Sequence, residues 1–270
     1  MDMLQSVLLG VVQGLTEFLP VSSSGHLAVV QALFGIQEVP LFYDVMLHVG
    51  TLVAVFIVLW PEIKAIICHP VKNKLGMLII ATIPAVVVVL VMKQVFPAVY
   101  DNLQNGKYLA FGFFATTAVL VISELIARRM EHKRKIGLPQ AVVMGVMQAG
   151  ATMMPGLSRS GSTIAGGLFM GTGRERAAKF AFLMSIPAII GSALFTAKDV
   201  VETGMGDVSI PMVIIGMIAA AVCGFLAIKF MLRLISKHKL YGFAIYTAAL
   251  GVIVLLEATM YGNVFISPFA

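Results

Sequence analysis

Long apolar runs alternate with short polar segments along almost the whole of this 270-residue chain. A helix needs about 20 predominantly apolar residues to cross the hydrocarbon core of a bilayer. Six segments of the sequence come close to or exceed that length and are separated by charged or turn-forming residues. These segments are residues 41–60, 77–92 with its flanks, 108–127, 180–197, 210–228 and 241–260. The pattern therefore predicts six transmembrane helices.

Four other apolar stretches are too short to cross a bilayer, and they occur as two pairs. Each pair is joined by a turn rich in Pro, Ser and Gly, which is PVSSSGH at 20–26 in the first pair and PGLSRSGST at 155–163 in the second. Non-helical backbone at membrane depth is tolerated only where protein buries it or water reaches it. We therefore expect two re-entrant helical hairpins within an all-α integral membrane protein. The four short stretches are residues 3–12, 27–36, 140–154 and 164–171.

The composition supports a membrane protein and argues against a nucleic-acid partner. Hydrophobic residues make up 59% of the chain and charged residues 12%, whereas soluble domains carry roughly 25% charged residues. Such a chain has too few charges to cover a surface that faces water. The net charge of +6 comes from basic residues that cluster between the apolar runs, which is the pattern of cytoplasmic loops rather than of a nucleic-acid surface.

The distribution of Lys and Arg also predicts an orientation. Most basic residues fall on one side of the predicted spans, and the positive-inside rule assigns that side to the cytoplasm. With six spans, both termini are then expected outside the cell membrane. The first hairpin is expected to enter from the outside, which opens the site outward, and the second from the cytoplasm. The basic segments are 64–74, 128–135, 174–179 and 229–239, and the other side carries Lys93, Lys107 and Lys198.

The two halves of the chain, 1–135 and 136–270, resemble each other in the order of their elements. When the chain is shifted by 135 residues, GVVQ at 10–13 falls on GVMQ at 145–148, and a proline and a serine of the two turns also coincide. Each half contains a hairpin and then three spans. Because three is odd, the second half must be inverted. In inverted repeats, broken helices meet near the membrane midplane and direct their N-termini toward anionic groups, so we expect the two turns to face each other.

The first turn contains a set of polar residues that capping alone does not explain. Gln13 and Glu17 lie four residues apart and therefore on one helix face, and a carboxylate inside a membrane is a functional candidate by default. Pro20 is expected to end the first helix. Serine is a favoured N-cap, but one cap accounts for only one of the three serines at 22–24. His26 follows within a turn of them, so we expect it to be functional as well.

The second turn has the features of an anion site. Gly156 and Gly161 let the backbone come close to a ligand, and the helix expected to begin near Ser160 would offer its free N–H groups to an anion. Arg159 has a planar guanidinium suited to phosphate oxygens. No acidic residue lies near it in the sequence. We therefore expect Arg159 to have only hydroxyls and amides around it and to bind an anionic ligand.

Together the two turns contain the groups that phosphoryl transfer requires. Serine hydroxyls and an imidazole can share the roles of nucleophile and base. Gln13 and Glu17 could hold a divalent cation, for which Mg²⁺ and Ca²⁺ are the candidates because both prefer oxygen ligands. A substrate that reaches such a site inside the membrane is expected to be a lipid with a phosphate head group.

On these residues the chain resembles the undecaprenyl-diphosphate phosphatase family, also called bacitracin resistance proteins. The resemblance covers nearly the full length and depends on QGLTEFLPVSSSGH at 13–26 and PGLSRSGST at 155–163. The family motif has glutamate or glutamine, three residues and then glutamate. Here the pair is Gln13 and Glu17, which leaves one carboxylate and weakens the expected chelation of a metal.

The resemblance implies hydrolysis of undecaprenyl diphosphate to the monophosphate and phosphate, which recycles a carrier lipid for the cell wall and confers bacitracin tolerance. It leaves open whether Ser23 or His26 attacks phosphorus, and whether the chain forms a homodimer. The implied catalytic residues are Ser23, His26 and Glu17, and the implied diphosphate-binding residues are Arg159, Ser158, Ser160, Thr163 and Ser22.

Two alternative functions are suggested by the same sequence features. A polyprenyl-phosphate flippase or another transporter of anionic lipids would also suit an inverted repeat with a site at the midplane, and it would move lipid without releasing phosphate. A second class of membrane lipid phosphatases needs a histidine shortly after a Ser-Arg pair, but the next histidine after Arg159 is His238, which excludes that class.

Some polar residues in the predicted spans have simpler structural interpretations. Asp44 and His48 either line the cavity or form a hydrogen bond in helix packing. We expect Glu124 to reach polar surroundings at the end of its span, and Arg174 to mark the cytoplasmic side.

Overall fold

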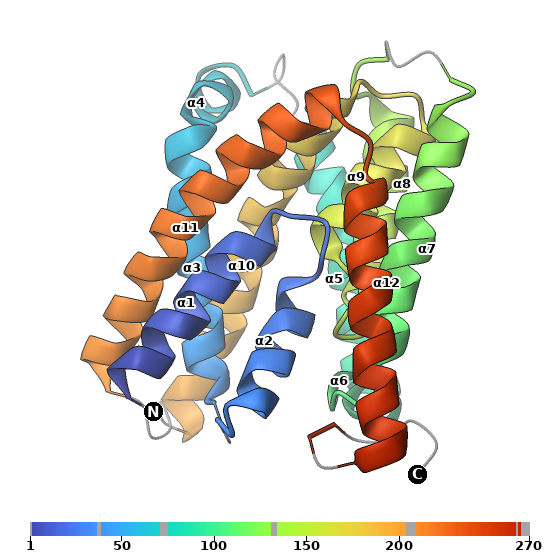
Figure 1. The fold of residues 1–270 in the computed structure, drawn as a ribbon. Coiled ribbons are helices and arrows are strands. Elements are labelled where there is room, and N and C mark those ends of the chain that lie inside the picture. The colour runs from blue at the N-terminus through green and yellow to red at the C-terminus, as the bar shows by residue number, and fades with distance from the viewer. Residues whose placement is uncertain are drawn as a thin grey trace.

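The computed structural model of the chain describes residues 2–36, 39–70, 75–130, 134–203, 209–262 and 264–265, and these residues are almost entirely helical (Figure 1). They form twelve α-helices and one short π-helix. The α-helices are α1 Met3–Glu17, α2 Ser23–Leu33, α3 Leu41–Val58, α4 Trp60–Cys68, α5 Leu75–Val95, α6 Pro97–Gln104, α7 Leu109–Ala127, α8 Leu138–Ala151, α9 Arg159–Phe169, α10 Arg174–Thr203, α11 Ile210–Lys237 and α12 Tyr241–Leu256, and the π-helix η1 is Glu257–Tyr261.

Six of these helices are long and apolar enough to cross a membrane, as the sequence pattern predicts. They are α3, α5, α7, α10, α11 and α12, the last continued by η1. α11 extends well beyond the predicted end at residue 228, to Lys237. The extension contains Lys229 and Arg233, which end the apolar run without ending the helix, because Lys and Arg are good helix formers.

Two short helices, α4 and α6, were not expected from the pattern. They contain 9 and 8 residues respectively, too few for a periodic apolar run to identify them. Both carry a proline in the first turn, Pro61 in α4 and Pro97 in α6. Proline is favoured there because the missing N–H would have no partner in the helix.

The short helices occur in two pairs, α1 with α2 and α8 with α9. In Figure 1, α1 rises from the lower end to about mid-height, and α2 returns to the lower end. α1 packs along α11, and α8 packs along α5. These contacts require very small residues, because a Cβ on Gly10 would clash with the backbone of Gly216, and a Cβ on Gly145 would clash with the backbone of Ala81. Small residues let membrane helices approach closely.

Apolar side chains cover much of the outside as well as the core. The largest buried cluster includes Phe18, Leu120, Met144 and Phe182, so it draws on both halves of the chain. On the outside, residues such as Ile245, which is 71% exposed, show apolar side chains to the surroundings. Large apolar surfaces of this kind mark contact with a membrane or another protein, which agrees with the six candidate spans.

The basic segments lie together at one end of the bundle. α4 and the turn between α11 and α12 lie at the upper end in Figure 1, whereas the start of α1 and the end of α12 lie at the lower end. This arrangement agrees with the grouping of basic residues on one side. Lys72, Lys74 and Lys133, which contribute to that grouping in the sequence, lie outside the described residues.

Glu124 reaches polar surroundings through Arg174, a partner that the sequence did not indicate. Glu124 is completely buried, and its two oxygens accept hydrogen bonds from Nη1 and Nη2 of Arg174 at 2.7 and 2.6 Å. The same carboxylate accepts the backbone N–H of Leu240 at 2.9 Å. This ion pair joins α7, α10 and the start of α12.

Candidate functional site

The first turn begins where α1 ends at Glu17, three residues before Pro20. α2 then starts at Ser23 with Ser22 as its N-cap. The hydroxyl of Ser22 accepts a hydrogen bond from the backbone N–H of Gly25 at 3.3 Å. One serine therefore caps the helix, as expected, while the side chain of Ser23 stays available for another contact.

The second turn follows α8, and α9 begins at Arg159 with Ser158 as its N-cap. The hydroxyl of Ser158 accepts the backbone N–H of Gly161 at 3.1 Å. Gly156 has φ +88°, and a Cβ there would meet the carbonyl oxygen of Leu109 at 2.5 Å. Thr116 of α7 holds this turn, because it donates to the Gly156 carbonyl at 2.7 Å and accepts from the Ser158 N–H at 2.8 Å.

The two turns pack directly against each other, which confirms the expectation that they face one another. The hydroxyl of Ser160 in the second turn donates to the carbonyl of Leu19 in the first at 2.8 Å. Gly25 lies so close to Gly156 that a Cβ on Gly25 would be 3.0 Å from the Cα of Gly156. Segments more than a hundred residues apart thus form one polar centre.

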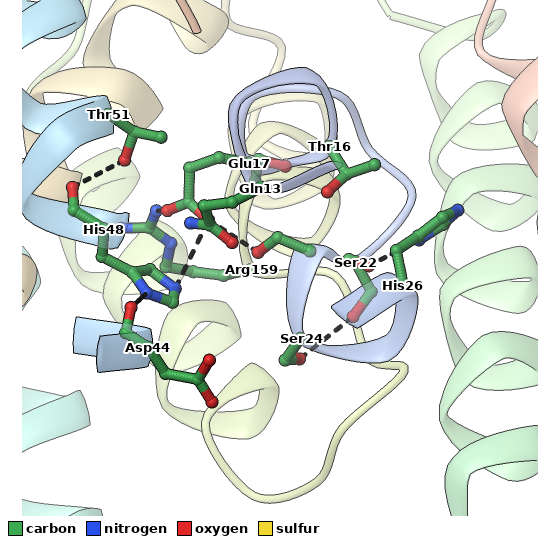
Figure 2. A network of polar contacts seen from close by, with 12 residues as sticks. Gln13, Thr16, Glu17, Ser22, Ser24, His26, Asp44, His48, Thr51 and Arg159 are labelled. Atoms are coloured by element: carbon green, nitrogen blue, oxygen red, sulfur yellow. Dashed lines mark hydrogen bonds and ion pairs between the residues drawn. The ribbon is translucent and has the colours of Figure 1, made fainter. Parts of the chain in front are cut away.

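The carboxylate of Glu17 lies at this centre, and the residue is only 4% exposed. Its Oε2 accepts the hydroxyl of Ser23 at 2.6 Å and Nε2 of Gln13 at 3.0 Å. Its Oε1 accepts a hydrogen bond from Nη2 of Arg159. Figure 2 shows Glu17 with Gln13, His48 and Arg159 gathered around it.

The ion pair between Arg159 and Glu17 corrects one prediction. The sequence suggested that Arg159 has no carboxylate beside it, but its partner Glu17 is the last residue of α1, 142 positions earlier. The side chain of Arg159 stays 21% exposed, whereas that of Glu17 is 3% exposed. An anion can therefore approach the guanidinium from its exposed side, while the buried carboxylate of Glu17 holds the guanidinium on the other side.

His26 faces away from this carboxylate. Its Nδ1 lies 2.7 Å from the carbonyl oxygen of Ser22, and its Nε2 lies 2.7 Å from the hydroxyl of Tyr246 in α12. The imidazole stacks on the Tyr246 ring, and in Figure 2 it points away from Glu17. Among the described residues, no hydrogen bond joins His26 to Glu17 or Ser23. The structure thus brings Ser23 and Glu17 together and places His26 on the other side of the first turn.

The remaining predicted phosphate ligands are buried hydroxyls. The hydroxyl of Thr163 donates to the carbonyl oxygens of Arg159 and Ser160 at 2.9 and 3.1 Å. The hydroxyls of Ser158 and Ser160 lie 3.3 Å apart, as do those of Ser22 and Ser24. Most of these hydroxyls therefore already have protein partners that hold the two turns in shape.

His48 belongs to the same cluster. The sequence left open whether His48 lines the cavity or forms a hydrogen bond in helix packing. Its Nε2 lies 3.7 Å from Oε2 of Glu17, and its Nδ1 lies 2.8 Å from the carbonyl oxygen of Asp44. The spacing of four between Asp44 and His48 in an apolar span was the available signal. Nothing in the sequence around Tyr246 or Thr116 marked those two residues.

The predicted cation ligands are adjacent but largely occupied by protein donors. Both oxygens of Glu17 accept hydrogen bonds, whereas Oε1 of Gln13 is buried and has no partner. Within the described part of the chain, no group of three or more His, Cys, Asp or Glu could hold a metal ion. The unpaired amide oxygen of Gln13 fits a hard cation such as Mg²⁺, provided that the phosphate oxygens of a substrate supply further ligands.

Comparison with known proteins gives a consistent result over the whole chain. Residues 6–253 match the family model described as bacitracin resistance protein BacA. The undecaprenyl-diphosphatase of Alkaliphilus metalliredigens is 42% identical over 275 residues, covering 95% of this chain and 98% of its own length. That of Carboxydothermus hydrogenoformans is 41% identical, covering 95% and 97%, and that of Methanosphaera stadtmanae is 35% identical, covering 95% and 98%. A six-span helical chain with these two apposed turns therefore belongs to the bacitracin resistance protein BacA family.

Proposed function

We propose that this chain hydrolyses undecaprenyl diphosphate to the monophosphate and inorganic phosphate. The observation that carries the proposal is the hydroxyl of Ser23 at 2.6 Å from the buried carboxylate of Glu17, which also pairs with Arg159. A nucleophile, a proton acceptor and an anion-binding group then lie in one cluster, as phosphoryl transfer requires. The names of the relatives support the same substrate.

The proposed reaction begins at Ser23. Arg159 binds oxygens of the terminal phosphate, Ser23 Oγ attacks its phosphorus, and Glu17 accepts the hydroxyl proton. The bond from this phosphorus to the bridging oxygen breaks, and the lipid monophosphate leaves with that oxygen. Water then attacks the phosphoserine, one of its protons restores the Ser23 hydroxyl, and the proton on Glu17 passes to the released phosphate. This order assigns the nucleophile to Ser23, since His26 faces Tyr246.

A divalent cation is the proposed cofactor. Gln13 and Glu17 would hold it together with phosphate oxygens, and its charge would offset that of the diphosphate. We expect phosphate release to fall when EDTA is added and to recover when Mg²⁺ or Ca²⁺ is restored. Full activity in EDTA would show that the cation is not required.

We further infer that the two halves form an inverted repeat with re-entrant hairpins. Two helix contacts support this inference, because Gly10 lies against Gly216 and Gly145 lies against Ala81. A shift of 135 residues carries Gly10 to 145 and Ala81 to 216, so the two contacts exchange partners between the halves. That exchange is expected of a two-fold axis in the membrane plane.

The proposed orientation places both termini outside and the basic end in the cytoplasm. It is testable with the native cysteine Cys68, which is exposed in α4 at the basic end. In intact cells, a membrane-impermeant maleimide is expected to label an Asn105→Cys variant, altered at the end of α6, but to leave Cys68 unlabelled in the unchanged chain. Labelling of Cys68 in the unchanged chain, with no additional labelling in the variant, would reverse the orientation.

The decisive measurement is phosphate release from undecaprenyl diphosphate by the purified chain. We expect Arg159→Ala to lower the rate about a hundredfold, which is the usual loss when a group that stabilises developing charge is removed. Transport of the intact lipid across reconstituted vesicles, with no phosphate released, would instead favour the transporter reading. Equal rates for the variant and the unchanged chain would exclude Arg159 as a phosphate ligand.

A further inference from the structure

The backbone of Ser22 is unusual, and Ser22 directly precedes Ser23. Among the described residues, it is the only one other than glycine with a positive φ, at φ 71° and ψ 100°. A residue in such a sparsely populated region is strained and persists only when its surroundings hold it there. Because Ser22 leads into Ser23, its conformation sets the direction from which the Ser23 side chain approaches Glu17.

His26 supplies the contact that holds Ser22. The carbonyl oxygen of Ser22 accepts the backbone N–H of His26 at 3.1 Å, and Nδ1 of the same residue lies 2.7 Å away. A carbonyl oxygen can only accept a hydrogen bond, so Nδ1 must carry a proton. In the neutral imidazole, Nε2 is then an acceptor and receives the hydroxyl of Tyr246 at 2.7 Å.

Two aromatic rings fix the plane of the imidazole. The Tyr246 ring stacks on it with centroids 5.6 Å apart and an angle of 13°, and the edge contact of Phe113 has a centroid distance of 5.8 Å. Tyr246 is 48% exposed, whereas His26 is 9% exposed, so the Tyr246 hydroxyl gives the buried imidazole its partner at Nε2. With Nδ1 on Ser22 and Nε2 on Tyr246, both ring nitrogens are engaged away from Ser23.

We propose that His26 and Tyr246 are positioning residues for the nucleophile. Tyr246 orients His26, His26 holds the Ser22 carbonyl, and the turn held in this way keeps the Ser23 hydroxyl against Glu17. This inference rests on the proposed phosphatase reaction and adds Tyr246 to it. It also replaces an acid–base or nucleophilic role for His26 with a role in which only its Nδ1–H is needed.

Three substitutions at His26 separate these roles. Asparagine places an amide N–H near the position of Nδ1, glutamine places one near Nε2, and alanine offers neither. In phosphate release from undecaprenyl diphosphate by the purified chain, we expect His26→Asn to keep kcat within about tenfold, whereas His26→Gln and His26→Ala lose at least about a hundredfold with little change in KM. If His26→Asn is as inactive as His26→Ala while its thermal midpoint is unchanged, the proposal is wrong.

Tyr246→Phe tests the outer link, because it keeps the stacked ring and removes only the hydroxyl. We expect kcat to fall about tenfold without a change in KM, and the matched control Tyr261→Phe, at the end of η1, to stay within about twofold. Since the Tyr246 hydroxyl acts through Nε2 of His26, the loss should vanish in the His26→Asn background. A loss of the same size in that background would overturn the proposal. Absence of phosphate release by the unchanged chain would instead refute the proposed function.

Discussion

Glu17→Gln is expected to lower kcat for phosphate release about a thousandfold, within the range seen when a general base is removed. Glutamine has nearly the same shape, but its amide cannot take the proton of Ser23, which lies 2.6 Å from the carboxylate. It also leaves the guanidinium of Arg159 without its negative partner. The measurement is the initial rate of phosphate release at saturating undecaprenyl diphosphate, with KM determined separately.

Ser23→Ala provides a second variant in which the ion pair of Glu17 and Arg159 stays intact. We expect its kcat to fall by a similar factor. The kcat of the double variant should be hardly lower than that of either single variant, because the effects of residues that act as a unit are not additive. Thr16→Val is the matched control, since its hydroxyl donates to the Val12 carbonyl of its own helix. Multiplicative losses in the double variant would show that Ser23 and Glu17 act in separate steps.

The arrangement of helices was largely predictable because membrane crossing imposes a length and an apolar composition. Those constraints identified six spans and two pairs of short helices, with errors mainly at the ends. The bounds of α11 were missed because Lys229 and Arg233 end the apolar run but not the helix. The short helices α4 and α6 lie outside the reach of this pattern, since neither is long enough to show it.

The composition of the site was also predictable, but its pairings were not. The two turns and their direct contact followed from the predicted repeat, whereas the partner of Arg159 did not, because it lies 142 positions away. The direction of His26 depends on its side-chain rotamer and on Tyr246, 220 positions later in α12. The residues next to His26 or Arg159 in the sequence carry no information about side-chain contacts with residues more than a hundred positions away.

The same limit applies to Glu124 and Arg174, whose pairing leads to a prediction about stability. Glu124 is fully buried and meets Arg174 through two hydrogen bonds of 2.7 and 2.6 Å. Removing one partner of a buried ion pair leaves a charge without compensation and typically costs about 3–5 kcal/mol. Because the side chain of Arg174 is 21% exposed, we expect Glu124→Ala to lower the free energy of unfolding by about 3 kcal/mol, near the lower end of this range.

The thermal midpoint of the purified chain in detergent measures this loss, and Glu175→Ala is the matched control. Glu175 pairs with Lys179 at 3.1 Å, but its side chain is 55% exposed, and exposed pairs contribute only about 0–1 kcal/mol. Glu124→Ala should therefore lower the midpoint clearly, while Glu175→Ala hardly changes it. Arg174→Ala should also destabilise, and the double variant should lose less than the sum, since its two sites are in contact. Equal midpoints for Glu124→Ala and Glu175→Ala would mean that the pair does not hold α7, α10 and α12 together.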